Sequence, residues 1–480
     1  MFDPGPLTTA LLILLVIMIF NVIIFVHELG HFWAAKWRGL KIDRFQIWFG
    51  KPIWKKTING VQYGLGWIPA GGFVALPQMA PMEAIEGDNR DAGEPLPPIS
   101  PLDKIIVAFA GPLFSFLLAF VCSLMIWKIG RPLEVLPTTE VGWVEAGSPA
   151  EKAGFQRGDT ILAIDGEPVS SWDGSLDSIR VKIITSRNEK IRFTVNRPGV
   201  GELDLVSGYT IPETSWWERR ATREVGIEWK AGPVQLLLLD AENSPAKLAG
   251  VKEGDVALSL NGTEIVARLQ FLELLEDNGD KPVELVVERT EESGEKVTKT
   301  LTIQPAKPLN PTPDIDRYMI GVTPWGQADI IDTLEYPNPK EQITGTLQQM
   351  WLTVRSVASP KSSIGIQHLS GPIGISKIQF FSLLMEHPLR RILGFMVLIN
   401  INLALLNLLP FPVLDGGHIT IATMEAIARR PVNVKFLEVL QMGFVFLLFG
   451  IMLYVSSKDL FDDFGVGGGE APKIEFAEPG

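Results

Sequence analysis

Four long apolar stretches constrain this chain more than any other feature of its sequence. Each is about 20 residues long, which is enough for a helix to cross a bilayer. They run from Leu7 to Val26, Ile105 to Ile129, Ile392 to Leu409 and Phe436 to Tyr454. Asp3, and no basic residue, precedes the first stretch, so we expect a retained span rather than a cleaved signal peptide. The sequence therefore predicts an α-helical polytopic membrane core with four transmembrane helices.

Basic residues cluster on one side of these spans. Seven Lys and Arg residues follow the first span between positions 36 and 56, and Arg429, Arg430 and Lys435 separate the last two spans. Loops rich in Lys and Arg stay in the cytoplasm. We therefore expect both termini, and the long segment between the second and third spans, to lie on the opposite side of the membrane.

The long segment between spans is acidic and repeats itself. Between Pro132 and Lys340 there are 35 acidic and 22 basic side chains, a net charge of −13, so the rest of the chain sums to +1 of the total of −12. An acidic surface argues against a nucleic-acid partner. A single cysteine, Cys122, excludes internal disulfides and cysteine-based zinc sites. The segments SPAEKAGFQRGDTILAIDG and SPAKLAGVKEGDVALSLNG recur at a constant offset of 96, which indicates two copies of one module.

These repeats resemble bacterial PDZ domains, with a short helix, a Gly-Asp turn and a buried strand. The resemblance implies that the segments around Val225-Gly226-Ile227 and Ile320-Gly321-Val322 receive the end of a peptide. PDZ domains bind peptides by adding a strand to a sheet edge. A plain extracytoplasmic spacer remains the alternative. We place the two PDZ-like α+β domains at residues 132–230 and 231–325.

The sequence His27-Glu28-Leu29-Gly30-His31 ends the first span. On a helix, positions i and i+4 share one face, so both imidazoles can reach one Zn²⁺ while Glu28 accepts a proton from water. Two histidines and a glutamate are costly at the edge of a membrane span unless they have a function. This pattern predicts a catalytic zinc site.

A catalytic zinc site needs a third protein ligand, and the residues near the motif do not supply one. No Asp or Glu occurs between Asp43 and Glu83. Asp415 is the best candidate, because it follows a stretch broken by Asn, Pro and Gly where an uninterrupted third span is expected. Irregular backbone at membrane depth is tolerated only inside protein or along a cavity. We therefore expect His27, His31 and Asp415 to converge.

Together with the paired repeats, HELGH, the segment Ser370 to Gly374 (SGPIG) and NLLPFPVLDGGH resemble the site-2 protease family of intramembrane zinc metalloproteases, RseP-type with two tandem PDZ domains. The resemblance implies that His27, His31 and Asp415 bind zinc, that Glu28 is the general base, and that Asn402 and Asn407 hold the substrate backbone. Two departures concern the substrate side. Trp48 stands where the family often has Gly in Gly-Phe-Gly, and Ser115 where it often has Asn.

Other features have competing interpretations. The segment Ile53 to Leu76 is predicted to be a hairpin with an Asn-Gly type I′ turn; it is either an ordinary cytoplasmic hairpin or the re-entrant β hairpin of the family, which could hold an extended substrate. Asn402 and Asn407 could instead link helices. His418 could be a fourth ligand, although four protein ligands would close the site. Residues Gln342 to Ile366 could form an amphipathic interfacial helix or a soluble core helix.

These features predict six parts of the chain. Residues 1–131 and 392–460 form the two parts of the membrane core, the two PDZ-like domains follow the first part, 326–391 is a linker with the amphipathic helix, and 461–480 is a flexible tail. The resemblance implies an inner-membrane zinc endopeptidase that cuts single-pass membrane proteins of the anti-sigma-factor type after a first extracytoplasmic cut, and signal-peptide remnants. A non-catalytic scaffold and a transporter are the rival classes.

Overall fold

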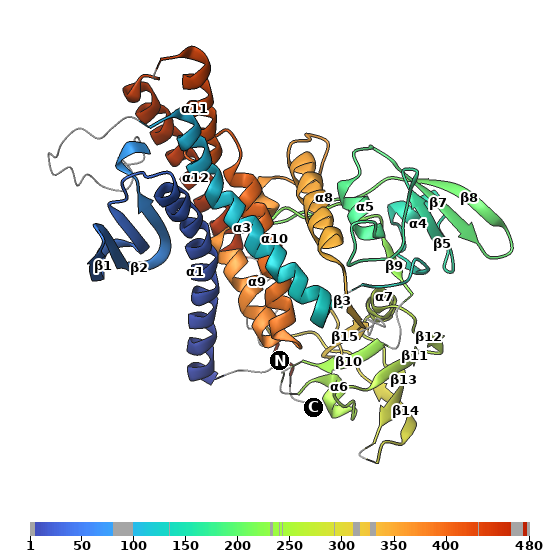
Figure 1. Cartoon of the computed structure of the whole chain (residues 1–480). Helices are drawn as coiled ribbons and strands as arrows, with labels where there is room; N and C mark the ends of the chain where they lie inside the picture. The colour runs from blue at the N-terminus through green and yellow to red at the C-terminus, as the bar shows by residue number, and fades with distance from the viewer. Residues whose placement is uncertain are drawn as a thin grey trace. The chain divides into compact units, whose positions relative to one another are not determined.

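Four long apolar helices in the computed structural model match the four predicted spans (Figure 1). The first helix continues past the predicted end of its span at Val26, so the HELGH sequence lies within a helix rather than at its end. The third helix ends at Asn407, where the polar and Pro/Gly-rich stretch begins. The four helices are α1 (Gly5–Trp37), α3 (Pro101–Ile129), α10 (Pro388–Asn407) and α12 (Val434–Phe461).

The structure describes residues 5–79, 99–133, 135–230, 234–239, 241, 243–291, 293–310, 317–326, 333–430, 432–461 and 474–477. Contacts divide the chain into two compact units. The helical unit contains Met1–Pro132, Leu334–Val354 and Leu369–Phe461. The sheet unit contains Leu133–Thr333, Arg355–His368 and Asp462–Gly480.

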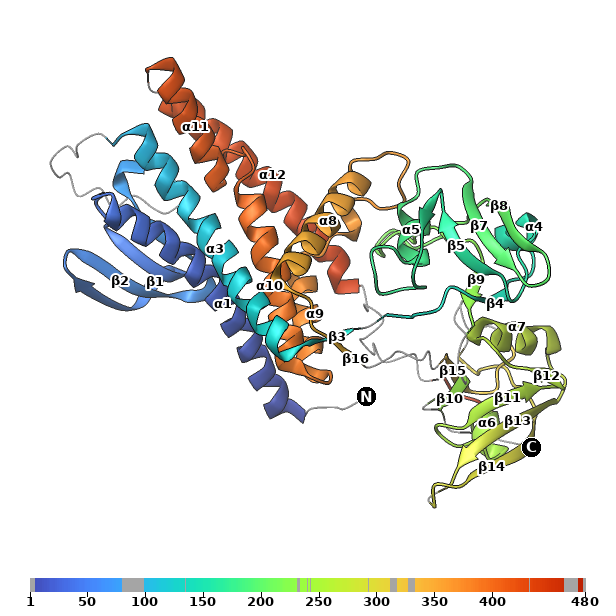
Figure 2. The same cartoon turned by 45° about the vertical axis from the view of Figure 1, so that its right-hand side comes forward.

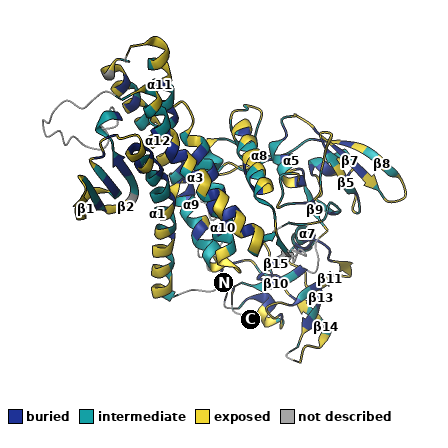
Figure 3. Ribbon diagram, viewed as in Figure 1, coloured by how far each residue is buried: buried dark blue, intermediate teal, exposed yellow. Residues whose placement is uncertain are grey.

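Much of α1 is exposed (Figure 3), and many of the exposed residues of α1 and α12 are apolar. Leu7 is 75% exposed, and Val439 and Phe446 of α12 are 74% and 69% exposed. Exposure of such apolar surfaces to water is unfavourable, whereas contact with lipid hydrocarbon chains is not. These exposed faces agree with helices that lie in a bilayer.

The helix α3 lies at the centre of the helical unit, where it packs against α1, α10 and α11 (Asp415–Ala428). Ser100 caps its first turn by accepting a hydrogen bond from the backbone N–H of Asp103, and Pro101 occupies the first helical position. Ile126 of α3 is fully buried in a cluster with Ile23 of α1 and Ile401 of α10. The three helices thus share one apolar core.

Helix α9 (Pro372–Leu384) was not expected, because the linker was predicted to contain one helix only. Its start is held by Asp459 of α12, which is fully buried and accepts hydrogen bonds of 2.9 Å from the backbone N–H groups of Gly371 and Gly374. A Cβ atom added at Gly374 would lie 2.5 Å from Asp459 Oδ1. The glycines of SGPIG therefore allow a carboxylate from another helix to cap α9.

The predicted amphipathic helix is α8 (Pro339–Val357), which ends before the predicted limit at Ile366. Its apolar residues Leu347, Trp351 and Val354 are 39%, 66% and 50% exposed. These side chains are more exposed than those of a soluble core helix usually are. Two short 3-10 turns are also present, η1 (Pro77–Met79) and η2 (Ile366–His368).

The predicted hairpin is present and begins earlier than expected, as β1 (Arg44–Ile58) and β2 (Val61–Ala75). Asn59 and Gly60 both have positive φ, 49° and 82°, as a type I′ turn requires. The first part of β1 has partners on both sides, since Ile47 pairs with Leu65 and with Gly72. The segment 72–75 therefore lies at an edge of this small sheet.

The first module of the sheet unit, residues 135–230, contains a four-stranded sheet of order β6-β5-β7-β8 and a pair, β4-β9. Its core includes Ile161, Phe193 and Val195, all fully buried. Its elements are β4 (Val141–Val144), α4 (Pro149–Ala153), β5 (Thr160–Ile164), β6 (Glu167–Pro168), α5 (Ile179–Thr185), β7 (Ile191–Arg197), β8 (Gly201–Ser207) and β9 (Ile227–Trp229). A further pair joins β3 (Arg131–Leu133) to β16 (Thr333–Glu335).

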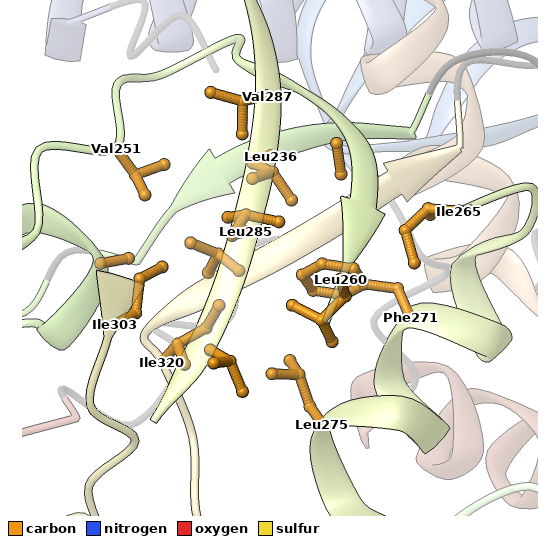
Figure 4. Packing of buried hydrophobic residues seen from close by; sticks show 14 of the residues in the cluster. Leu236, Val251, Leu260, Ile265, Phe271, Leu275, Leu285, Val287, Ile303 and Ile320 are labelled. Atoms are coloured by element: carbon orange, nitrogen blue, oxygen red, sulfur yellow. The ribbon is translucent and has the colours of Figure 1, made fainter. Parts of the chain in front are cut away.

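The second module, residues 234–326, repeats this plan in one sheet of order β14-β13-β11-β10-β15, with β12 paired to β11 (Figure 2). Phe271 of α7 is fully buried against Leu260 and Leu285 of the sheet (Figure 4). The elements are β10 (Val234–Leu238), α6 (Pro245–Leu248), β11 (Val256–Leu260), β12 (Thr263–Glu264), α7 (Arg268–Asn278), β13 (Val283–Thr290), β14 (Lys296–Ile303) and β15 (Val322–Gly326).

A buried ion pair recurs in both modules. Asp159 accepts a 2.7 Å hydrogen bond from Arg197 Nε, and Asp255 accepts one of 2.7 Å from Arg289 Nε. Each arginine also donates to a backbone carbonyl at 2.7 Å, that of Gly154 or Gly250. The Gly-Asp turns of the repeat therefore hold the same charged partner, which belongs to the corresponding strand of each copy, β7 or β13.

The buried ion pair predicts a localised loss of stability. Arg289→Met should leave the Asp255 carboxylate buried without its cation, which costs about 3 kcal/mol and speeds the exchange of β13 amide hydrogens about a hundredfold. Lys296→Met is the control. Lys296 is 66% exposed and forms a surface ion pair with Glu288, so its loss should change amide hydrogen exchange in β13 little. Hydrogen exchange with mass spectrometry measures both; equal exchange in the two variants would contradict the prediction.

Candidate metal centre

Two helices bring the three predicted ligands together. His27 and His31 project from one face of α1, and Asp415 is the first residue of α11. His27 Nε2 lies 3.3 Å from Asp415 Oδ2, and His31 Nε2 lies 3.4 Å from Asp415 Oδ1. All three ligand atoms lie within 4.8 Å of one another, the one such group of His, Cys, Asp and Glu within the described residues.

The other nitrogen of each imidazole has a partner in α3. His31 Nδ1 lies 2.8 Å from the carbonyl oxygen of Val107, which can only accept, so this nitrogen carries the proton and Nε2 keeps its lone pair. His27 Nδ1 lies 3.0 Å from the hydroxyl oxygen of Ser115, a fully buried side chain. Both rings are therefore oriented with Nε2 toward Asp415.

The ligand atoms are arranged as a cation would require. The Nε2 atoms of His27 and His31 lie only 3.3 Å apart, and the buried Asp415 Oδ2 has no hydrogen-bond partner among the residues that the structure describes. Buried carboxylate oxygens are normally paired or bound to a metal. Two imidazoles and one carboxylate are the protein ligands of many catalytic zinc sites, which leave a fourth position open. The residues present therefore fit a zinc ion.

Glycines allow this close approach. A Cβ atom added at Gly111 of α3 would lie 2.2 Å from His31 Nε2 and 2.9 Å from His27 Nε2. A Cβ atom at Gly30 of α1 would lie 2.3 Å from the carbonyl oxygen of Ala110. The first turn of α11 is equally tight, since Cβ atoms at Gly416 and Gly417 would lie 2.3 Å and 2.1 Å from the carbonyl oxygens of Leu408 and Phe411.

A cavity of about 370 Å³ opens beside these ligands. Glu28 lines it together with the three ligands, and Gly72 of the β2 edge lies next to Glu28, since a Cβ atom added there would be 3.6 Å from Glu28 Cγ. Phe49 and Phe73 of the hairpin also line the cavity. The edge of the sheet and the predicted general base thus face the same space.

The other residues predicted for the site differ in whether they line this cavity. Asn407, at the end of α10, lines the cavity, whereas Asn402 does not. His418 also lines the cavity but is not one of the three clustered ligands, in agreement with a site that keeps an open position. Buried Oδ1 atoms of Asn400 and Asn402 have no hydrogen-bond partner within the described residues.

Trp48, which stands where the site-2 protease family often has glycine, lies in the hairpin. Its φ of 68° is a left-handed conformation that glycine adopts without strain. The indole Nε1 of Trp48 donates a hydrogen bond to Asn21 Oδ1 of α1, and the amide of Gln46 donates to the carbonyl oxygens of Trp48 and Gly50. These contacts hold the tryptophan where a glycine was expected and attach the hairpin to α1.

Sequence reasoning misses the partners of the ligands. Ser115 stands out in the sequence only as a departure from the family, and Gly111 and Val107 do not stand out at all. A signal exists for Gly111, because a glycine followed by Pro112 inside an apolar span indicates close helix packing. Nothing in the sequence indicates which backbone carbonyl an imidazole contacts.

The glycine at the centre of this packing predicts a loss of metal. Gly111→Ala should place a methyl group against both imidazoles and lower bound zinc at least tenfold, measured by metal analysis of purified protein. Gly394→Ala in α10 is the matched control, because a Cβ atom there would meet no atom of the described residues within 4 Å, and it should keep stoichiometric zinc. Full zinc binding by Gly111→Ala would show that the imidazoles do not meet at this face of α3.

Comparison with known proteins agrees with this centre. The model of peptidase family M50 matches residues 15–451. A putative zinc metalloprotease of Pasteurella multocida is 30% identical over 87% of this chain and 91% of its own length. The regulator of sigma E protease of Haemophilus influenzae is 30% identical over 92% of this chain and 96% of its own. RseP of Escherichia coli is 29% identical over 87% and 91%. The chain therefore belongs to peptidase family M50 and is a membrane-embedded zinc metalloprotease.

Proposed function

We propose that His27, His31 and Asp415 bind the catalytic zinc ion and that Glu28 is the general base of an endopeptidase acting on transmembrane segments. The observation that carries this proposal is the convergence of three ligand atoms within 4.8 Å beside a cavity lined by Glu28. His27 lies about 33 Å along α1 from Gly5 at 1.5 Å per residue, so the scissile bond lies near one end of the span.

The division of labour follows from the residue types. When bound, zinc lowers the pKa of water and polarises the scissile carbonyl. Glu28 accepts the proton of the attacking water and later gives it to the leaving amine. Val107 and Ser115 keep the imidazoles oriented, while the first turn of α11 stabilises the negative charge of Asp415 through the helix dipole.

The substrate must leave the helical state before hydrolysis, because a helix shields its peptide bonds. We propose that the 72–75 edge of β2 pairs with an extended substrate by strand addition. This edge lies beside Glu28 and contributes Gly72 and Phe73 to the cavity, which supports the re-entrant interpretation of the hairpin. Asn407 would hold the substrate backbone from the opposite side, and Asn402 would act through α10.

The biological substrates follow from the relatives. The relatives from Haemophilus influenzae and Escherichia coli are named as regulator of sigma E proteases, so we propose an anti-sigma-factor-type protein, already cut outside the cytoplasm, as the substrate of this chain. Signal-peptide remnants present the same chemistry, a single apolar span. The role is the second cut of regulated intramembrane proteolysis in a stress response at the bacterial inner membrane.

The two modules of the sheet unit would select the substrate. We propose that they are PDZ-like domains in the periplasm that act as a size filter or read new C-termini. The basic loops after α1 and before α12 support this orientation, because they favour the cytoplasm. The exposed apolar face of α8 would rest on the bilayer surface.

Substitution of the base and of the distant ligand tests the catalytic proposal. Glu28→Gln should retain zinc and lose cleavage of a tagged single-span substrate at least 1000-fold, since only the proton acceptor is removed. Asp415→Asn should lose both zinc and cleavage. Immunoblots of cells that co-express enzyme and substrate give the rates. Normal cleavage by either variant would overturn the mechanism.

The two asparagines of α10 provide a second test. Asn407→Ala should raise KM or lower kcat for a transmembrane substrate about tenfold, because Asn407 lines the cavity. Asn402→Ala, the matched change five residues earlier, should alter thermal stability more than turnover, because its side chain lies outside the cavity lining. Steady-state cleavage in detergent micelles distinguishes them; a larger kinetic defect in Asn402→Ala would contradict this assignment.

A further inference from the structure

The chain's own residues 474–477 lie on the second module. The backbone N–H of Leu309 donates a 2.7 Å hydrogen bond to the carbonyl oxygen of Glu475, and the backbone N–H of Glu475 donates one of 3.0 Å to Asn310 Oδ1. A flexible tail was predicted for 461–480; these four residues differ because Ile474 and Phe476 find an apolar surface, while 462–473 lie outside the described residues.

The segment binds as an extended peptide with alternating side chains. Ile474 and Phe476 are 8% and 4% exposed, whereas Glu475 and Ala477 between and after them are exposed. The two buried side chains contact a surface that we call the apolar corner, which consists of Leu239, Ala241, Ala306 and Met319. Recognition therefore depends on two apolar residues separated by one residue.

The apolar corner is separate from the core of its module. The core cluster, with Phe271, Leu285 and Ile320 at its centre, contains neither Ile474 nor Phe476. Ile474, Phe476 and Ala241 form a cluster of their own. The second module therefore has a complete core beneath this surface, and the segment is an addition to it.

The first module provides an internal comparison. The backbone N–H of Glu145 donates to the carbonyl oxygen of Gly226 at 3.0 Å, as Leu239 does to Gly321 at 3.1 Å. Thr210 and Glu224 form the isolated bridge that Ala306 and Met319 form in the second module.

The equivalent corner of the first module is thus polar, with Glu145, Thr210 and Glu224 in place of Leu239, Ala306 and Met319. Burial and the negative charge of the neighbouring Glu145 raise the pKa of Glu224, because the two carboxyl groups lie close together. Because the same fold forms with acids here, an apolar corner is not required for folding.

We propose that the apolar corner is a binding site for an extended peptide with apolar residues two apart, and that residues 474–477 are its resident ligand. The segment makes one backbone–backbone hydrogen bond, one hydrogen bond to the Asn310 side chain and two apolar side-chain contacts. Such a contact is weak for a separate peptide, and it persists because the covalent link gives the segment a high effective concentration. A peptide of the same pattern displaces it.

The resident segment also lies close to the turn before the sheet edge. A Cβ atom added at Gly321 would lie 3.4 Å from Phe476 Cε2, and Gly321 precedes β15, the last strand in the sheet order. Displacement of the segment would therefore remove a close neighbour of Gly321.

Peptide binding to the full chain in detergent tests the proposal. The probe is a fluorescent peptide with the sequence of residues 473–480, KIEFAEPG, followed by anisotropy. Chain that ends at Lys473 should bind one peptide per molecule, and the intact chain should bind it at least tenfold more weakly. An intact chain with Ile474→Ser and Phe476→Ser should behave like the truncated one.

Matched controls separate this site from non-specific binding. A peptide with Glu475→Gln and Ala477→Ser should bind normally, and one with Ile474→Ser and Phe476→Ser should not bind. Met319→Glu, which copies the residue of the first module, should abolish binding to the truncated chain. The amide of Leu309 should exchange slowly in the intact chain, rapidly after truncation, and slowly again with peptide, while β13 amides stay unchanged.

Two results would overturn the proposal: no binding by a truncated chain whose β13 amides remain protected, or equal binding by intact and truncated chains. Peptide binding is measured in the Glu28→Gln background as well. It should be unchanged there, so failure at this site and failure of the proposed protease mechanism are distinguishable.

Discussion

The close contact between α1 and α3 is the interaction on which the metal centre depends. Gly30 on one helix and Gly111 on the other bring the backbones so near that no Cβ atom fits at either position. This contact lets Val107 and Ser115 of α3 reach the Nδ1 atoms of both imidazoles. The lone pairs of Nε2 then point toward Asp415, so orientation of the ligands is a consequence of helix packing.

Asp415 depends on a second tight contact. Gly416 and Gly417 let the first turn of α11 pack on the carbonyl groups of Leu408 and Phe411, at the point where α10 has ended. The irregular stretch between α10 and α11 therefore positions the Asp415 carboxylate next to the two imidazoles. Its backbone lies beside a cavity, where water and protein groups can satisfy it.

Much of this could be predicted from residue patterns. Apolar runs predicted the four spans, the i, i+4 histidines predicted two ligands on one face, and the broken stretch before Asp415 indicated where a third would enter. Ser115 and Gly111 could not be assigned, because their importance arises from which helix packs against α1. The partners of Asp159 and Asp255 were also hidden, since Arg197 and Arg289 are separated by 92 residues rather than the 96 of the repeat.

The two modules show how one fold carries different surfaces. Both retain the Asp–Arg pair beneath the Gly-Asp turn, a contact that the buried aspartate requires. They differ at the corner where the second module has Leu239 and Met319 and the first has Glu145 and Glu224. The composition of residues 461–480 suggested only a tail, because two isolated apolar residues reveal a binding segment only when the surface that they cover is known.

X-ray absorption at the zinc edge tests the central claim most directly. For the purified chain, the account predicts zinc with two imidazole nitrogens and otherwise oxygen ligands, at about 2.0–2.2 Å. His31→Ala should reduce the imidazole contribution to one or remove zinc. A sulfur ligand at about 2.3 Å, or a spectrum that is unchanged in His31→Ala and in Asp415→Asn, would contradict a centre built from His27, His31 and Asp415.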